Sequence, residues 1–368
     1  MKVLIIESIG SGAALVNAAI ELGWDCYILS YNKDDRKLPK TELWKNCKIL
    51  EIDTNNESSV ISYLNTLSIN FDVIVSGNEY YVPLAIQLTN YYNIIGLPKE
   101  LKKISHNKLE MRKFLKEKGI RSPWFTSISN INELKDNKTI TFPCIIKPKE
   151  AAGSYHVNKA YTKEELITYY LSIQNETHKE LNHTLGDEVL IEEYLEQPEY
   201  SVEGYFSLEK LHFASITKKF LSKEPYFVEI GHVTPTTEIS PQQKDVILNY
   251  LKDILDATGV KYGVFHCEIR FNNEHLPVLV EIAYRLPGDK IVDLINISTN
   301  IDLAKAMLLS YAGLPYNPPK NNNILFAGIA FYHDNTNLKD YRDRKGFEII
   351  KNTDEYIVLS QLQQIWNQ

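Results

Sequence analysis

The stretch 264-VFHCEIRFNNEHLPVLVEIAYR-285 is the most informative part of this sequence. Two runs of alternating side chains flank residues 272–275, Asn-Asn-Glu-His, and a polar loop of four residues is typical of a β-hairpin. Pairing Phe271 with Leu276 closes this loop and brings the apolar faces of both strands together. The predicted apolar face consists of Phe265, Cys267, Ile269, Phe271, Val278, Val280, Ile282 and Tyr284.

The opposite face of the hairpin collects charged side chains, namely His266, Glu268, Arg270, Glu281 and Arg285. The register makes Glu268 and Glu281 diagonal neighbours, roughly 7–8 Å apart between backbones. Two carboxylates this close repel each other unless a cation lies between them. Arg270 or Arg285 could supply that charge, and so could Mg²⁺, which prefers oxygen ligands. A solvated polar face with incidental ion pairs is the alternative interpretation.

Composition excludes several classes of protein. The chain has 368 residues, 44% of them hydrophobic and 24% charged, which is the range of globular proteins with two or three domains. The formal charge is 40 − 47 = −7 without a block of basic residues, so we expect no nucleic-acid partner. No apolar run is long enough for a membrane helix, and no leader-like segment opens the chain, so we expect a soluble cytoplasmic protein. The four cysteines are far apart in sequence, which disfavours a zinc site or a disulfide framework.

The order of the predicted elements suggests at least two domains. Residues 2–7 read as a buried strand, a Gly-Ser-Gly turn follows at 10–12, and further strands are predicted at 26–30 and 71–76. This α/β alternation predicts a doubly wound parallel sheet. From about residue 200 to 284 strands predominate around one helix near 241–257, so the remainder is α+β. The tract 317–323, Asn-Pro-Pro-Lys-Asn-Asn-Asn, reads as a linker into a short C-terminal piece.

Several further motifs occur in a fixed order before and after the hairpin. They are Asn107–Arg112, Gly119–Pro123, the strand Phe142–Pro148 with its lysine Lys147, the small-residue turn Ala152–Ser154, Glu192–Leu195, Glu199–Gly204 and Arg285–Asp289. In this order they resemble the ATP-grasp superfamily, over nearly the whole chain to about residue 310. Segments 227–235 and 281–288 are most similar to the bacterial L-amino acid ligases, the bacilysin-type dipeptide ligase group.

The resemblance implies a domain organisation. Residues 1–104 would form a Rossmann-like pre-ATP-grasp domain, and residues 105–310 the ATP-grasp domain, with a lid subdomain at about 139–190 and a mixed sheet that holds the metal site. Residues 311–368 would form a C-terminal extension packed on the ATP-grasp domain.

The resemblance also implies an ATP site. Two lysines, Lys108 and Lys147, would contact phosphates, because an ammonium group is a point-charge donor to anionic oxygens. The loop 150–157, with Gly153 and Ser154, would cover the phosphates. Base and ribose would be held by Glu192, Glu193, Tyr194, Leu195 and Glu199.

The remaining implied roles concern the reaction itself. Glu268 and Glu281 would bind Mg²⁺ or Mn²⁺, and Ala283 stands where many ATP-grasp enzymes have a further Asn ligand. Arg285 would steady the transferred phosphoryl group and contact substrate, and Gly288 would let a backbone N–H approach an oxyanion. Glu229 and His232 would recognise the amino acid.

The expected function is therefore ATP-dependent ligation of an amino acid carboxylate to an amine, with ADP formation, and the amine is expected to come from a second amino acid. A carrier-protein acceptor or a carboxylase reaction keeps the same chemistry. An NAD-dependent oxidoreductase would need a third glycine after Gly10 and Gly12, where Leu15 stands. A non-catalytic nucleotide-binding module is the remaining alternative. Large cytoplasmic enzymes of this kind are often homodimers, and the sequence leaves the assembly open.

Overall fold

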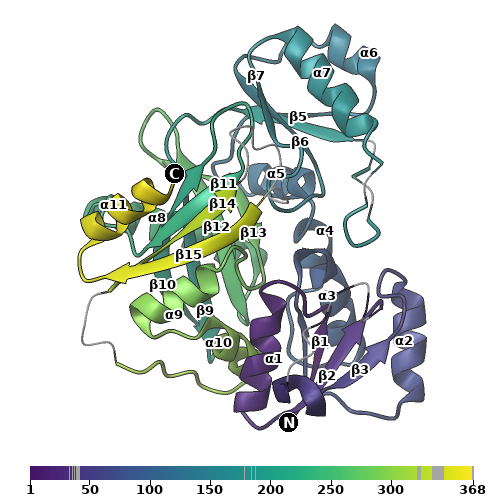
Figure 1. The fold of residues 1–368 in the computed structure, drawn as a ribbon. Helices are drawn as coiled ribbons and strands as arrows, with labels where there is room; N and C mark the ends of the chain where they lie inside the picture. The colour runs from purple at the N-terminus through teal and green to yellow at the C-terminus, as the bar shows by residue number, and fades with distance from the viewer. Residues whose placement is uncertain are drawn as a thin grey trace.

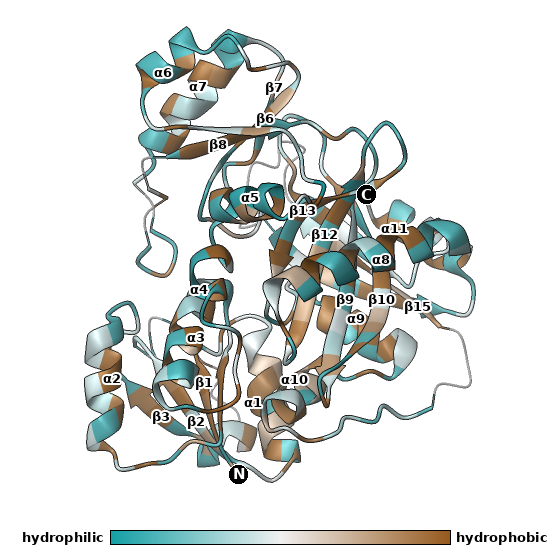
Figure 2. Ribbon diagram, turned by 180° about the vertical axis from the view of Figure 1, so that it is seen from behind, coloured by the Kyte–Doolittle hydropathy of each residue, from teal (hydrophilic) through white to brown (hydrophobic). Residues whose placement is uncertain are grey.

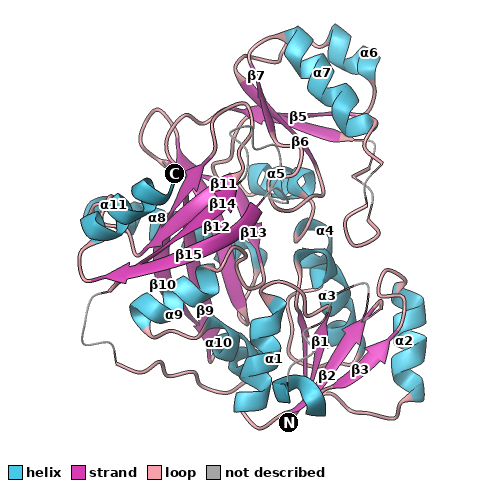
Figure 3. Ribbon diagram, viewed as in Figure 1, coloured by secondary structure: helices cyan, strands magenta, loops and turns pink. Residues whose placement is uncertain are grey.

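The structure is a computed structural model that describes residues 1–366 apart from 33, 35, 37, 39–41, 178, 184, 187, 321–324 and 334–343. Part of the predicted linker, Asn321–Asn323, lies outside the described residues. Three sheets organise the described chain, with the N-terminal sheet, a small sheet and a large sheet at separate corners of the molecule (Figures 1 and 3). No helix of the described chain has the length and apolar character needed to cross a membrane.

The N-terminal sheet is parallel, as the sequence predicts, and its strand order is β3-β2-β1-β4. Alternate residues of β1 pack on opposite sides of this sheet. Ile5 packs with Leu15 of α1 in the main core, whereas Ile6 packs with Val60 of α2 in a second core. Burial of both faces explains why the strand is a continuous apolar run, which is brown in Figure 2. The elements are β1 Lys2–Ile6, α1 Gly12–Glu21, β2 Asp25–Ser30, η1 Glu42–Asn46, β3 Lys48–Glu51, α2 Glu57–Thr66, β4 Val73–Ser76, η2 Glu79–Tyr81 and α3 Val82–Tyr91.

The Gly-Ser-Gly turn has a structural explanation. Gly10 has a positive φ of 59°, and a Cβ on Gly12 would clash with the backbone of Gly77, which follows β4. The backbone conformation at Gly10 and the close packing at Gly12 therefore account for the two glycines of this turn.

The small sheet, of order β5-β8-β6-β7, is antiparallel and carries α6 and α7 on its outer side (Figure 1). Helices α4 and α5 connect it to the N-terminal sheet. The elements are α4 Leu101–Ile104, α5 Lys108–Glu117, β5 Phe125–Ile128, α6 Ile131–Asp136, β6 Cys144–Pro148, β7 Asn158–Ala160, α7 Lys163–Gln174 and β8 Val189–Glu193.

The large sheet has the order β13-β12-β9-β10-β11-β14-β15 and is antiparallel. The two last strands of the chain thus extend this sheet at one edge. Its elements are β9 Tyr200–Ser207, β10 Lys210–Leu221, β11 Glu229–Thr234, α8 Pro241–Thr258, β12 Val264–Phe271, β13 Pro277–Ala283, α9 Ile291–Thr299, α10 Leu303–Tyr311, β14 Phe326–His333, β15 Arg344–Asn352 and α11 Glu355–Trp366.

The hairpin β12–β13 forms as predicted, but its register differs. Phe271 pairs with Pro277 rather than with Leu276, because Asn272 Oδ1 accepts a hydrogen bond from the amide of Leu276 (2.9 Å) and keeps that residue in the turn. Val280 is then an extra residue on β13, a β-bulge that shifts the register between Glu268 and Ile269.

The bulge changes which side chains share a face. Leu279 packs in the main core, where the alternation predicts Val278 and Val280. Val280 instead lines a pocket. Glu268 pairs directly with Glu281, so the two carboxylates are not the diagonal neighbours that the simple register predicts.

Candidate active site

Most of the site residues predicted from the sequence line one pocket of about 990 Å³, which is open to solvent. It lies between the small sheet and the hairpin of the large sheet. Its lining includes Lys108, Lys147, Gly153, Ser154, Glu192, Glu193, Tyr194, Leu195, Glu199, Glu229, Glu268, Glu281 and Arg285. We call it the first pocket.

A second pocket of about 1150 Å³ adjoins the first. The two share Ala152, Gly153, Glu229, His266, Glu268 and Arg285. The second pocket is otherwise lined by turns of the N-terminal sheet and by residues that follow the hairpin, among them Gly10, Ser11, Asn78, Glu79, Gly288, Asp289 and Arg344. Predicted residues from distant parts of the chain therefore meet where the two pockets join.

The paired carboxylates at this junction each contact a lysine. Lys108 Nζ lies 3.2 Å from Glu281 Oε1, and Lys219 Nζ contacts Glu268. Lys219 also lies 2.6 Å from Glu229 and 3.1 Å from Glu199. Burial of Lys219 opposes its charge, but Glu229, Glu268 and Glu199 outweigh that effect and raise its pKa well above the usual value.

His266 adds a second cation beside Glu268. Its Nε2 lies 3.3 Å from Glu268, while its Nδ1 lies 2.8 Å from the buried Glu203. Burial would lower the pKa of His266, but the hydrogen bonds to Glu203 and Glu268 raise it to about 9. Burial likewise opposes ionisation of Glu268, yet Lys219 and His266 hold its pKa well below the usual range.

On the other side of the first pocket, Lys147 has a protein counter-charge. Its Nζ lies 2.6 Å from Glu192 Oε2, and Arg112 Nε lies 2.6 Å from the other carboxylate oxygen. All three side chains are buried. Glu192 and Glu193 are the last two residues of β8. The Glu192 carboxylate is thus engaged by two cations.

The segment after β8 is held by aromatic and basic contacts. Lys159 Nζ lies 3.6 Å from the centre of the Tyr194 ring. Arg270 donates from Nη1 to the carbonyl of Leu195 (2.8 Å) and from Nε to Glu199 (3.0 Å). The strand β12 therefore fixes the position of two residues that the sequence assigns to nucleotide binding.

Three residues of the loop 150–157, which borders the first pocket, have positive φ angles: Gly153, Ser154 and His156. It is anchored at one end by Lys108 Nζ, which donates to the carbonyl of Ala151 (2.5 Å). At the other end His156 Nε2 lies 2.9 Å from Glu176 at the end of α7. Such positive φ angles cost non-glycine residues free energy and are typical of functional loops.

Arg285 spans the junction toward the N-terminal sheet. Its Nε lies 2.5 Å from Glu79 Oε2, and its Nη1 donates to the carbonyl of Leu286 (2.8 Å). Burial opposes ionisation of Glu79, but Arg285 and His106 lower its pKa to about 2. Gly288 lines the second pocket, and a Cβ there would meet no atom within 4 Å.

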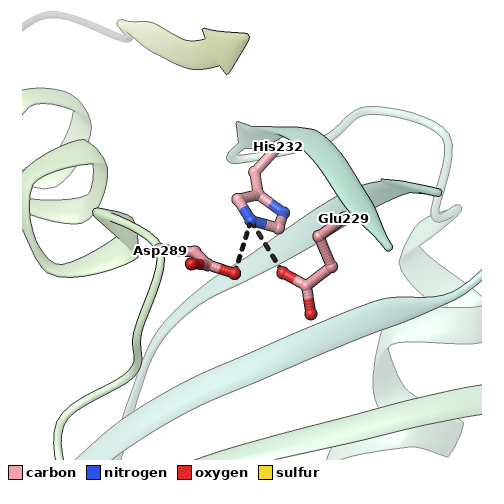
Figure 4. Close-up of side chains that lie close together, drawn as sticks. All are labelled: Glu229, His232 and Asp289. Carbon is pink, nitrogen blue, oxygen red and sulfur yellow. Dashed lines mark ion pairs between the residues drawn. The ribbon is translucent and has the colours of Figure 1, made fainter. Parts of the chain in front are cut away.

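Glu229, His232 and Asp289 form a compact group (Figure 4). His232 Nε2 lies 3.0 Å from Glu229 and 3.9 Å from Asp289. Burial would lower the pKa of His232, but Asp289 and Glu229 raise it. His232 is fully buried and lies behind Glu229 rather than at the pocket surface, so of the two only Glu229 lines the pockets.

Two sets of side chains in the described residues have potential ligand atoms within 4.8 Å of one another: Glu229, His232 and Asp289, and Glu199, Glu229 and Glu268. Glu281 belongs to neither. Lys219 already contacts every member of the all-oxygen set, so that set has its cation. The directly paired Glu268 and Glu281 remain suitable for a hard divalent ion, because oxygen donors from one or two carboxylates are what Mg²⁺ takes.

Sequence reasoning missed several residues of this site, namely Glu79, Arg112, Glu203, Lys219 and Arg344. Lys218 and Lys219 are adjacent in a strand, so one of them must point to each face of the sheet. That signal could have revealed a buried lysine, although it could not identify its partners Glu199, Glu229 and Glu268.

Comparisons with known proteins match residues 140–293 to the ATP-grasp domain family. The chain is 24% identical over 239 residues to the L-arginine-specific L-amino acid ligase of Bacillus subtilis, covering 65% of this chain and 57% of that protein. It is 22% identical over 299 residues to the uncharacterized protein y4rH of Sinorhizobium fredii, covering 80% of this chain and 61% of that protein. The chain thus spans about three fifths of the length of these relatives.

The crystal structure of the L-amino acid ligase from Bacillus licheniformis superimposes with a TM-score of 0.80 at 17% identity, over 100% of this chain and 97% of that one. This agreement shows that the fold is shared, including the parts outside residues 140–293. Residues 140–293 therefore match the ATP-grasp domain family, and the whole chain shares the fold of the Bacillus licheniformis ligase structure.

Proposed function

We propose that the protein is an ATP-dependent carboxylate–amine ligase that activates an amino acid and joins it to the amine of a second amino acid. The observation that carries this proposal is the junction of the two pockets at Glu268 and Arg285. One pocket has room and polar lining for a nucleotide, and the other for a small substrate, so both could present their reacting groups at one point. The similarity to the L-arginine-specific L-amino acid ligase of Bacillus subtilis supports the substrate class.

The reaction has two steps. A carboxylate oxygen of the first amino acid attacks the γ-phosphorus of ATP, the bond to the β-phosphate oxygen breaks, and an acyl phosphate and ADP form. The amine nitrogen then attacks the acyl carbon, the carbon–oxygen bond to phosphate breaks, and the amine gives up a proton. The products are an amide, ADP and phosphate.

The residues of the first pocket suit the first step. Lys108 and Lys147 would neutralise phosphate oxygens, and Tyr194, Leu195 and Glu199 would hold base and ribose. Glu268 and Glu281 would hold Mg²⁺, which when bound neutralises phosphate charge. Arg285 uses its Nε for Glu79 and its Nη1 for the carbonyl of Leu286, and its Nη2 would contact the transferred phosphoryl group at the junction.

The second pocket suits the amino acid. Glu229 would attract an ammonium group, and His232 behind it would orient that carboxylate. Gly288 lines the second pocket and has open space where a Cβ would stand, so its backbone N–H would be able to approach an oxyanion. The loop 150–157 would exclude water from the acyl phosphate, because hydrolysis would otherwise waste it.

The test is phosphate release from ATP and Mg²⁺ with the twenty amino acids, singly and in pairs, with mass detection of products. Release that requires a pair and yields a condensed mass supports the proposal. Release with one amino acid alone points to another acceptor, such as a carrier protein. Bicarbonate-dependent release without an amide product would indicate a carboxylase, and absence of ATP binding would contradict the proposal altogether.

A further inference from the structure

Arg344 brings a cation from the end of the chain into the second pocket. It is the first residue of β15, the edge strand of the large sheet, and its side chain is only 13% exposed. Together with Glu268, Arg285 and Gly288 it lines the second pocket, and it does not line the first. A guanidinium at this depth needs a compensating anion.

Asp289 and the backbone hold this guanidinium in one orientation. Nη1 and Nη2 of Arg344 lie 2.5 and 3.2 Å from the two carboxylate oxygens of Asp289, and Nη2 also donates to the carbonyl of Glu229 (2.9 Å). The guanidinium carbon lies 4.0 Å from the centre of the Phe331 ring. Within the part of the chain that the structure describes, Nε is buried and has no hydrogen-bond partner. Nη1 uses only one of its two N–H groups in these contacts, so the guanidinium keeps a further donor for an anionic ligand in the second pocket.

The location relative to the junction indicates which substrate Arg344 faces. The acyl phosphate must form where the nucleotide pocket meets the second pocket, so the attacking amine must occupy the second pocket. A third pocket of about 1000 Å³ shares Gly10, Ser11 and Asp289 with the second. This continuation toward α1 and α9 offers the amine a path that does not cross the nucleotide pocket.

We propose that Arg344 binds the carboxylate of the amine substrate, which makes a free α-amino acid, rather than a simple amine, the acceptor. This inference rests on the proposed ligase function and deepens it. The paired Asp289 keeps the guanidinium in place without consuming all its donors, because a guanidinium has five N–H groups. Asp289 itself is therefore occupied and is not the anion for a cationic substrate.

The test compares each acceptor amino acid with its carboxamide in the wild-type enzyme, by steady-state kinetics with the mass-verified substrate pair. We expect a KM for the amide at least about tenfold above that for the acid, since a charged hydrogen bond is lost. In Arg344→Gln the KM for the acid should rise by about 10- to 100-fold, while the KM for the amide and the KM for ATP should stay unchanged. The preference of the enzyme for the acid over the amide should therefore vanish. Arg344→Lys should be intermediate, because a lysine keeps the charge but not the fork.

Lys351→Gln, an exposed position on the same strand, is the matched control and should behave like wild type. If the wild-type enzyme is active and uses amide and acid equally, the proposed role of Arg344 is wrong, but the ligase function is not contradicted. This comparison needs no variant. An equal change of the KM for ATP and for the acceptor in Arg344→Gln would also overturn it, since that is a structural effect. Absence of amide-bond formation with every acceptor would instead overturn the ligase function, and the acceptor role with it.

Discussion

Lys219 Nζ lies 2.6 Å from Glu229 Oε1 on the neighbouring strand, and the side chain that carries it is only 1% exposed. Glu199 and Glu268 contact the same ammonium group. One lysine thus joins three strands of the large sheet and fixes Glu268 at the junction of the pockets. Its positive charge lies between three carboxylates in a buried place, where they would otherwise repel one another.

We therefore expect replacement of Lys219 to destabilise the folded protein. We expect Lys219→Met to lower the free energy of unfolding by about 3–5 kcal/mol, because it leaves buried carboxylates without their cation. Added Mg²⁺ should restore part of the loss, since a divalent ion can take the place of the missing charge. Urea denaturation with and without Mg²⁺ measures both effects.

Lys218→Met is the control for that experiment. Lys218 is the preceding residue on β10, is half-buried and pairs with Glu238, a partly exposed partner. Its loss should cost less than about 1 kcal/mol and should not respond to Mg²⁺. Equal costs at the two positions would show that the carboxylates around Lys219 do not depend on its charge.

Glu281→Gln tests the proposed metal pair. The amide keeps the shape of the side chain, but it removes the charge that would attract a divalent ion, so ADP formation should fall by about 100-fold or more. Because Glu281 is about one-quarter exposed, the melting temperature should change little. Glu274→Gln in the exposed hairpin turn should retain full activity. Unimpaired turnover in Glu281→Gln would remove Glu281 from the metal site.

The sequence predicts the fold, and many of the residues that line the two pockets, better than the contacts among those residues. The alternation over 264–285 correctly predicts a hairpin with carboxylates on one face, because period-two patterning is a local property. It places the register wrongly, since a bulge at Val280 depends on how β13 packs and on the Asn272 side chain that caps the turn.

The partners in the ion pairs could not be predicted from the sequence, for a related reason. Lys147 sits at the end of its strand as predicted, but its partner Glu192 comes from β8 and a third member, Arg112, from α5. Likewise Arg285 meets Glu79, which is 206 residues away. Such pairs follow from how three sheets are packed, and no short-range pattern encodes that arrangement.

Lys147→Met should weaken nucleotide binding. The buried lysine is oriented by Glu192 toward the first pocket, so its loss should raise the dissociation constant of ADP by about tenfold or more, as expected for a charge-assisted contact. Lys149→Met is the matched change two residues on, where the lysine pairs with Glu188 outside the pocket. Calorimetric titration with ADP compares the two, and equal affinities would exclude Lys147 from the phosphate site.

The pair Glu79–Arg285 predicts a pH dependence of stability. The pKa of Glu79 is lowered from 4.5 to about 2 in the folded protein, so its contribution is complete above about pH 5 and is lost as the pH falls toward 2. A shift of this size corresponds to about 3 kcal/mol. The difference in free energy of unfolding between wild type and Glu79→Gln should therefore be largest near pH 7 and shrink steadily below pH 4.5. Glu100→Gln, an exposed position, should follow the wild-type curve throughout. A wild-type advantage over Glu79→Gln that is independent of pH from 7 to 3 would mean that the carboxylate of Glu79 contributes by shape and hydrogen bonding rather than by its charge.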